Sequence, residues 1–210
     1  MDIDLVHHRI ENYTSEDNVI HKKAVALTKG LKSQLGDTKG IEGAKKYISA
    51  LINLLKVELS QEGGNNLQNT EAMVMTLSVA IKVAENSIRK YTDSLLDLVT
   101  QLGNSHCFHK YILIILEQLM LSRSETELQS LVDPVCVAFE IFTLENVIFS
   151  KSKENTLQLI KVYSKLFRTN SNPLQVNTNP TEIGSICKYT LLRSIVDKLK
   201  FYIRGMHAGD

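Results

Sequence analysis

Apolar residues recur at helical spacing along most of the chain. Between residues 18 and 35 they stand three or four positions apart, with lysines between them, and Gly36 follows the last one. A second apolar stripe starts after Gly40 and ends before a polar, glycine-rich stretch near residue 63. This period is typical of amphipathic helices, which pack one face on a core. The pattern therefore predicts two helices joined by a short connection.

The same period resumes beyond the glycine-rich stretch. It covers residues 69–102, with a break expected at residues 91–92. Residues 106–121 are apolar on nearly every side, which favours a helix surrounded by other helices. We therefore expect residues 106–121 to form the core helix.

Further helices are predicted in the second half of the chain. Residues 124–127 read Ser-Glu-Thr-Glu, the form of a capping box at a helix start. Pro134 lies about ten residues further on, where a proline removes a helical hydrogen bond and predicts a bend near residues 132–133. Two more apolar stripes follow at residues 157–167 and 181–203.

These elements and the connections between them define a fold class. No segment alternates apolar and polar residues over the length of a strand, and the 10 glycines and 3 prolines are too few for many turns. Short connections make neighbouring helices antiparallel. The sequence predicts an all-α fold of seven to nine antiparallel helices, either a HEAT/armadillo-like helical stack or a helical bundle. We expect one domain over residues 1–210, with loops near 61–68 and 169–180.

Composition narrows the class of protein. With 210 residues, 43% of them hydrophobic, the chain can bury a core without metals or disulfides. Its three cysteines, at positions 107, 136 and 187, are far apart and odd in number, which favours a reducing compartment. The N-terminus lacks the apolar run of a secretory signal. We therefore expect an intracellular protein, cytoplasmic or nuclear.

Known catalytic motifs are missing from the sequence. It contains no GxSxG, GxGxxG, HExxH or phosphate-binding GxxxxGK[ST] pattern. We expect no enzymatic activity and no cofactor, although catalytic residues that assemble only in space leave an enzyme as an alternative.

A short cluster of His and Cys residues raises the question of a metal. His106 and His109 share a helical face beside Cys107, but the chain has no second cluster to complete a zinc site. The simpler interpretation is that His106 caps the helix, Cys107 packs in the core and His109 faces water. We predict no metal site.

The net charge of +1 conceals an uneven distribution of charge. Residues 21–56 contain eight lysines and two acidic residues. Such a block can bind the phosphates of nucleic acid or of an acidic membrane, and this is a second possible function. The alternative is that the lysines only solvate the outer faces of two helices. The candidate phosphate-binding residues are Lys22, Lys23, Lys29, Lys32, Lys45 and Lys46.

The leading hypothesis concerns the helix expected at residues 135–149. It is apolar around more of its circumference than one neighbouring helix would cover, so Phe139, Phe142 and Phe149 are candidate partner-binding residues. We expect a non-enzymatic protein–protein interaction module or scaffold subunit of a larger intracellular assembly. Its partner would be another protein or a second copy of the chain, and no small-molecule substrate is evident.

Overall fold

A computed structural model describes residues 3–13, 17–36, 40–60, 66–103 and 105–122. Within these ranges the chain forms α-helices and short 3₁₀ helices and no strand, which confirms the all-α class for this part. The capping box at 124–127, the bend at Pro134 and the helices expected at 157–167 and 181–203 lie outside the described residues. So does the loop expected at 169–180.

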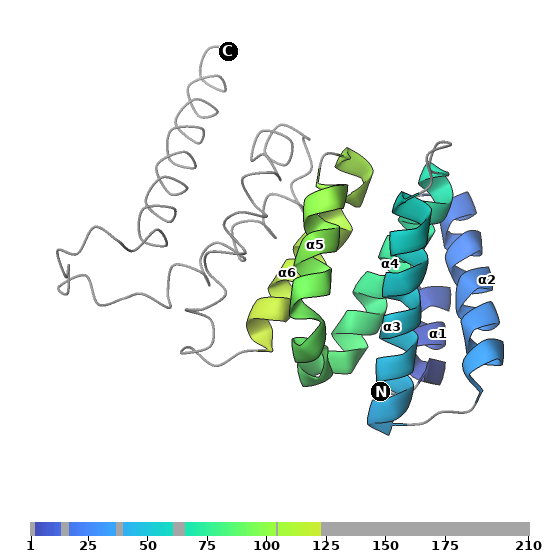
Figure 1. Ribbon diagram of the computed structural model, residues 1–210. Coiled ribbons are helices and arrows are strands. Elements are labelled where there is room, and N and C mark those ends of the chain that lie inside the picture. Colours follow the sequence, from blue (N-terminus) through green and yellow to red (C-terminus); the bar gives the residue numbers. More distant parts are fainter. Residues whose placement is uncertain (1–2, 14–16, 37–39, 61–65, 104, 123–210) are drawn as a thin grey trace, which may run out of the picture.

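The helices of the described part lie roughly side by side along much of their length (Figure 1). Each is joined to the next by a short connection. Their bounds are α1 Ile3–Glu11, α2 Asn18–Leu35, α3 Gly40–Leu59, α4 Leu67–Ala84, η1 Glu85–Tyr91, α5 Thr92–Leu102, η2 His106–Phe108 and α6 His109–Leu121.

Both ends of α2 have caps that explain the predicted bounds 18–35. The Asp17 carboxylate accepts hydrogen bonds from the amides of Val19 (2.8 Å) and Ile20 (3.3 Å), so it satisfies amides that have no partner within the helix. At the other end Gly36 has φ 66°, a left-handed conformation that favours glycine, and its amide donates to the Lys32 carbonyl at 3.1 Å. The prediction of this helix is confirmed to the residue.

The first helix, α1, was not predicted. It buries Ile3, Val6 and Ile10, which are three and four positions apart and so share one face. The helical signal was therefore present, but it covers only nine residues and polar residues surround it. This helix packs on α2 and α4.

The central element of the described part is α4, which contacts α1, α2, α3 and α6. From Val74 to Ile81 every residue of α4 is buried, including the polar Thr76 and Ser78. Their hydroxyls donate to backbone carbonyls within the same helix, so no hydroxyl proton is left unsatisfied. The expected core helix, α6, is also largely buried, and within the described part it contacts α4 and α5.

The break predicted at residues 91–92 coincides with the start of α5, although α-helical geometry ends earlier. α4 stops at Ala84, and η1 fills the interval up to Tyr91. The Tyr91 hydroxyl donates to the Lys45 carbonyl at 2.8 Å, which fixes this interval against α3. None of the described helices combines the length and apolar character needed to cross a membrane.

Candidate functional site

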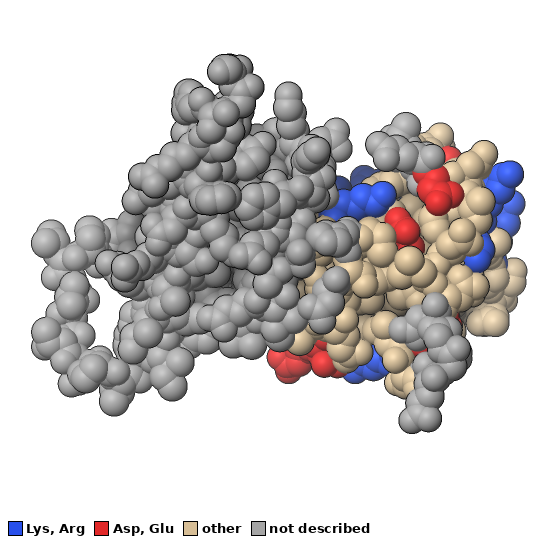
Figure 2. Space-filling view, turned by 90° about the horizontal axis from the view of Figure 1, so that it is seen from above, with Lys and Arg blue, Asp and Glu red and all other residues tan. Residues whose placement is uncertain are grey.

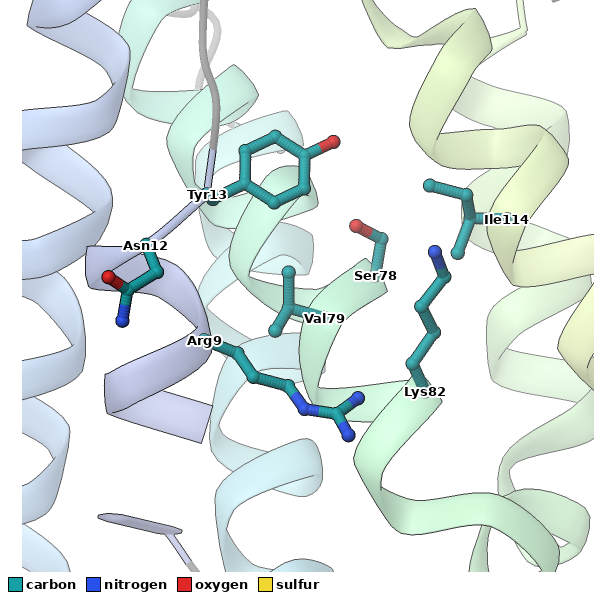
Figure 3. A pocket seen from close by; sticks show the side chains of 7 residues that line it. All are labelled: Arg9, Asn12, Tyr13, Ser78, Val79, Lys82 and Ile114. Atoms are coloured by element: carbon teal, nitrogen blue, oxygen red, sulfur yellow. The ribbon is translucent and has the colours of Figure 1, made fainter. Parts of the chain in front are cut away.

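A pocket of about 260 Å³ lies between α1, α4 and α6 (Figure 3). The end of α1 and the turn after it form one side, successive turns of α4 form the floor, and one side chain of α6 closes the other side. Its lining residues are Arg9, Asn12, Tyr13, Ser78, Val79, Lys82 and Ile114.

The α1 side of the pocket is held by the burial of its helix. Ile10 is fully buried, and this places the adjacent Arg9 at the surface. The Asn12 side-chain amide donates to the His8 carbonyl at 2.7 Å, and the Tyr13 amide donates to the Ile10 carbonyl at 3.1 Å. These bonds satisfy carbonyls at the helix end, so the turn that carries Asn12 and Tyr13 has a defined conformation.

The α4 side places an apolar and a cationic residue in the same pocket. Ser78, Val79 and Lys82 follow one another at helical spacing, and the Ser78 hydroxyl donates to the Met75 carbonyl at 2.8 Å. In Figure 3 the Lys82 side chain extends toward Ser78 and Ile114, while Arg9 extends from α1 toward α4.

The charges at the pocket are of one sign. Arg9 and Lys82 both line it, no acidic residue does, and neither cation pairs with a carboxylate among the described residues. The lining set contains no His, Cys, Asp or Glu. Its chemistry is that of anion binding.

The structure divides the six candidate lysines between different surroundings. Lys23 donates to the Asn69 side chain at 2.7 Å, Lys32 pairs with Asp4, and Lys45 pairs with Glu42 at 2.5 Å. The hydrogen bond and charge of Lys45 lower the pKa of the Glu42 carboxyl. The remaining candidates, Lys22, Lys29 and Lys46, are exposed.

Basic side chains on the face drawn in Figure 2 accordingly stand in separate groups, one of them along the edge formed by α2. Lys23 and Lys32 lie on opposite flanks of that helix, because one reaches α4 and the other reaches α1. The structure therefore does not bring all six lysines into one phosphate-binding surface. The other candidates, Phe139, Phe142 and Phe149, lie outside the described residues.

A second group of titratable residues surrounds Glu71 on α4. The Tyr111 hydroxyl donates to the Glu71 carboxylate at 3.4 Å, and the Lys110 ammonium lies 3.9 Å from the same oxygen. Burial raises the pKa of Glu71, and burial next to this carboxylate raises the pKa of the Cys107 thiol and of the Tyr111 hydroxyl. Cys107 is therefore held as the thiol, the form that is not nucleophilic.

The expected orientation of His109 is wrong. It was predicted to face water, but it is fully buried, and its Nε2 lies 3.0 Å from the Gly103 carbonyl. The carbonyl at the end of α5 gives the buried imidazole a hydrogen-bond partner, which offsets the cost of removing it from water. Among the described residues, no group of three or more His, Cys, Asp and Glu side chains is placed to hold a metal ion.

Sequence reasoning missed the pocket because its residues come from three separate segments. The available signal was the apolar spacing of Ile3, Val6 and Ile10, which identifies α1 and so places Arg9 beside a buried position. Comparison of the chain with known protein families, curated proteins and solved structures finds no match.

Proposed function

We propose that the chain is a non-enzymatic interaction module, a stack of antiparallel helices that binds another protein through one apolar end. The observation that carries this proposal is the position of the exposed apolar side chains. Of the six large apolar residues that are exposed in the described part, four lie where α2 begins, α3 ends and α4 begins. These four residues, which we call the apolar end, are Val19, Leu54, Val57 and Leu67.

Two hydrogen bonds support the closeness of these helix ends. The Lys23 ammonium donates to the Asn69 side chain at 2.7 Å and joins the early turns of α2 and α4. The Asn66 amide donates to the Glu58 carboxylate at 3.3 Å and joins the end of α3 to the start of α4. Figure 1 shows α2, α3 and α4 next to one another at this end.

The degree of exposure makes these residues candidates for contact. Val57 is 60% exposed, Leu67 54% and Val19 47%. Scattered apolar residues are normal on protein surfaces, but several at one place favour an interface. Burial against a partner stabilises the complex by about 25 cal/mol for each Å² of apolar surface that is removed from water. Leu54 and Val57 are three positions apart and share a face of α3.

The test uses the full chain with a photocrosslinking amino acid at position 57. We expect an adduct of defined mass with one partner polypeptide, either another protein or a second copy, and light scattering distinguishes the two. Leu67→Asp in the same chain should abolish the adduct, because a charge at the centre of an interface is not solvated.

Leu5→Asp is the matched control. Leu5 is 41% exposed and lies in the first turn of α1. The neighbouring Asp4 pairs with Lys32 near the end of α2, so this turn is at the opposite end of the helices from the apolar end, where α2 begins. This variant should retain the adduct. Equal loss in both variants, or no adduct from position 57, would contradict the proposal.

A further inference from the structure

We propose that the pocket between α1, α4 and α6 binds a small phosphate monoester, with the phosphate at Arg9 and Lys82 and the carbon framework against Val79 and Ile114. This site is separate from the apolar end and does not depend on the function proposed above. No residue is shared between the two.

The positive charge of the pocket is not balanced by its own lining residues. Arg9 and Lys82 come from different helices and line one pocket that contains no carboxylate. Elsewhere in the described part, lysines facing a neighbouring element do find partners, as Lys32 does with Asp4 and Lys110 with Glu71. Because the lining supplies no negative charge to either cation, a dianion that contacts both side chains would balance them.

A phosphate group matches these two cations in geometry and in charge. A guanidinium presents a planar fork of N–H donors that fits two phosphate oxygens, and an ammonium acts as a point charge on the others. A phosphate monoester carries close to two negative charges at neutral pH, one for each cation, whereas a carboxylate carries one.

The size of the pocket and its apolar lining residues suit a small organic ester. The pocket volume of about 260 Å³ is just below the roughly 300 Å³ at which the usual range of ligand-binding pockets begins, so only a small molecule would fill it. Val79 and Ile114 lie on opposite sides in Figure 3, with the Tyr13 ring on a third side. An aromatic or aliphatic ester group would bury apolar surface among them.

The experiment measures binding of phenyl phosphate to the full chain by calorimetry, with inorganic phosphate and benzoate in parallel. We expect phenyl phosphate to bind most tightly, inorganic phosphate more weakly because it lacks the ring, and benzoate more weakly because it carries one charge. Affinity should fall as salt rises, since the contacts are ionic.

The test variants remove each charge and keep the size of the side chain. Arg9→Gln and Lys82→Met should each weaken phenyl phosphate binding by about ten- to a hundredfold, the usual effect of losing one charged hydrogen bond. Both residues are exposed, so the variants should fold, and an unchanged melting temperature without ligand checks this.

Lys56→Met is the matched control. It removes one positive charge from α3, outside the pocket lining, and should leave the affinity unchanged. The inference is overturned if phenyl phosphate does not bind at about 10 mM, well above a Kd of about 1 mM. Equal weakening by Lys56→Met, or binding that survives both pocket variants, would also overturn it. Tighter binding of benzoate than of phenyl phosphate would contradict the phosphate assignment and would indicate a carboxylate ligand instead.

Discussion

Lys32 on α2 forms a salt bridge with Asp4 on α1, which lies 28 positions earlier in the chain. The pair joins a helix of the lysine-rich block at residues 21–56 to the N-terminal segment that precedes it, where residues 1–20 contain five acidic residues and one arginine. Part of the positive charge of this block is therefore balanced by acidic residues of the same chain. A count of charges along the sequence does not show this pairing and leaves all of the lysines available for phosphates. Lys45 and Glu42 balance a further charge within α3.

The Lys32–Asp4 pair should contribute little to stability. Its side chains are 40% and 56% exposed, and exposed pairs contribute about 0.2–1 kcal/mol. A double-mutant cycle with Lys32→Ala and Asp4→Ala, measured by urea unfolding, should give a coupling free energy in that range. The coupling should disappear at about 1 M salt, where the screening length is about 3 Å. A coupling above 2 kcal/mol would contradict this prediction.

Tyr47 should make the protein sensitive to alkaline pH. It is fully buried and its hydroxyl donates to Thr28 at 3.3 Å, and burial raises its pKa to about 12 from an ordinary value of about 10. The unfolded chain therefore loses this proton first, so the stabilisation is complete below pH 10 and is lost as the pH rises through about 12.

The size of this effect follows from the shift. Two pKa units correspond to about 2–3 kcal/mol of unfolding free energy. Tyr47→Phe should cost about 1 kcal/mol at neutral pH, through the lost hydrogen bond, and should flatten the decline above pH 10. Urea unfolding at a series of pH values tests this. Parallel pH profiles for Tyr47→Phe and the wild type would contradict it. Tyr111→Phe serves as a comparison, because burial also raises the pKa of the Tyr111 hydroxyl.

Two glycines of α2 should respond to alanine in opposite ways. Gly36 has φ 66°, so Gly36→Ala should destabilise by about 1 kcal/mol although no atom lies within 4 Å of the added methyl group. Gly30 lies inside the helix, also with open space around it, and Gly30→Ala should stabilise by about 0.5–1 kcal/mol. Thermal unfolding of the two variants tests this. A change of the melting temperature in the same direction for Gly36→Ala and Gly30→Ala would contradict the helix end at Leu35.

The short helix α1 should be part of the cooperative fold. Ile10 is 1% exposed and belongs to the same core as Ile20 and Leu51. Ile10→Ala should therefore lower the free energy of unfolding by about 2–5 kcal/mol, the cost of a cavity in a packed core. Arg9→Ala, at the adjacent exposed position, should change stability by less than about 0.5 kcal/mol. A loss below 1 kcal/mol for Ile10→Ala would mean that α1 is not firmly packed.

The helices of the described part were predictable where local signals act together. For α2 the apolar period, the acidic cap at position 17 and the glycine at position 36 all identify the same ends. For α1 only three apolar positions carry the period, which is too few for a pattern to stand out. The 3₁₀ geometry of η1 has no comparable local signal, because the Tyr91–Lys45 contact that holds it spans 46 positions.

The surroundings of single side chains were less predictable. His109 was expected to face water, but it is buried with its Nε2 beside the carbonyl of Gly103, which lies six positions earlier in the chain. The pocket depends on how α1, α4 and α6 pack, and no spacing within one helix encodes it. Pairing of Lys32 and Lys110 with distant acids is likewise a property of packing.

The central position of α4 has a consequence for synthesis on the ribosome. α1, α2 and α3 leave the exit tunnel first, yet each of them packs on α4, which begins at Leu67 and ends at Ala84. Until that last turn emerges, the parts of these three helices that pack on α4 have no cover and remain open to chaperones or to other nascent chains. The nascent chain therefore cannot complete this core until translation has passed well beyond residue 84.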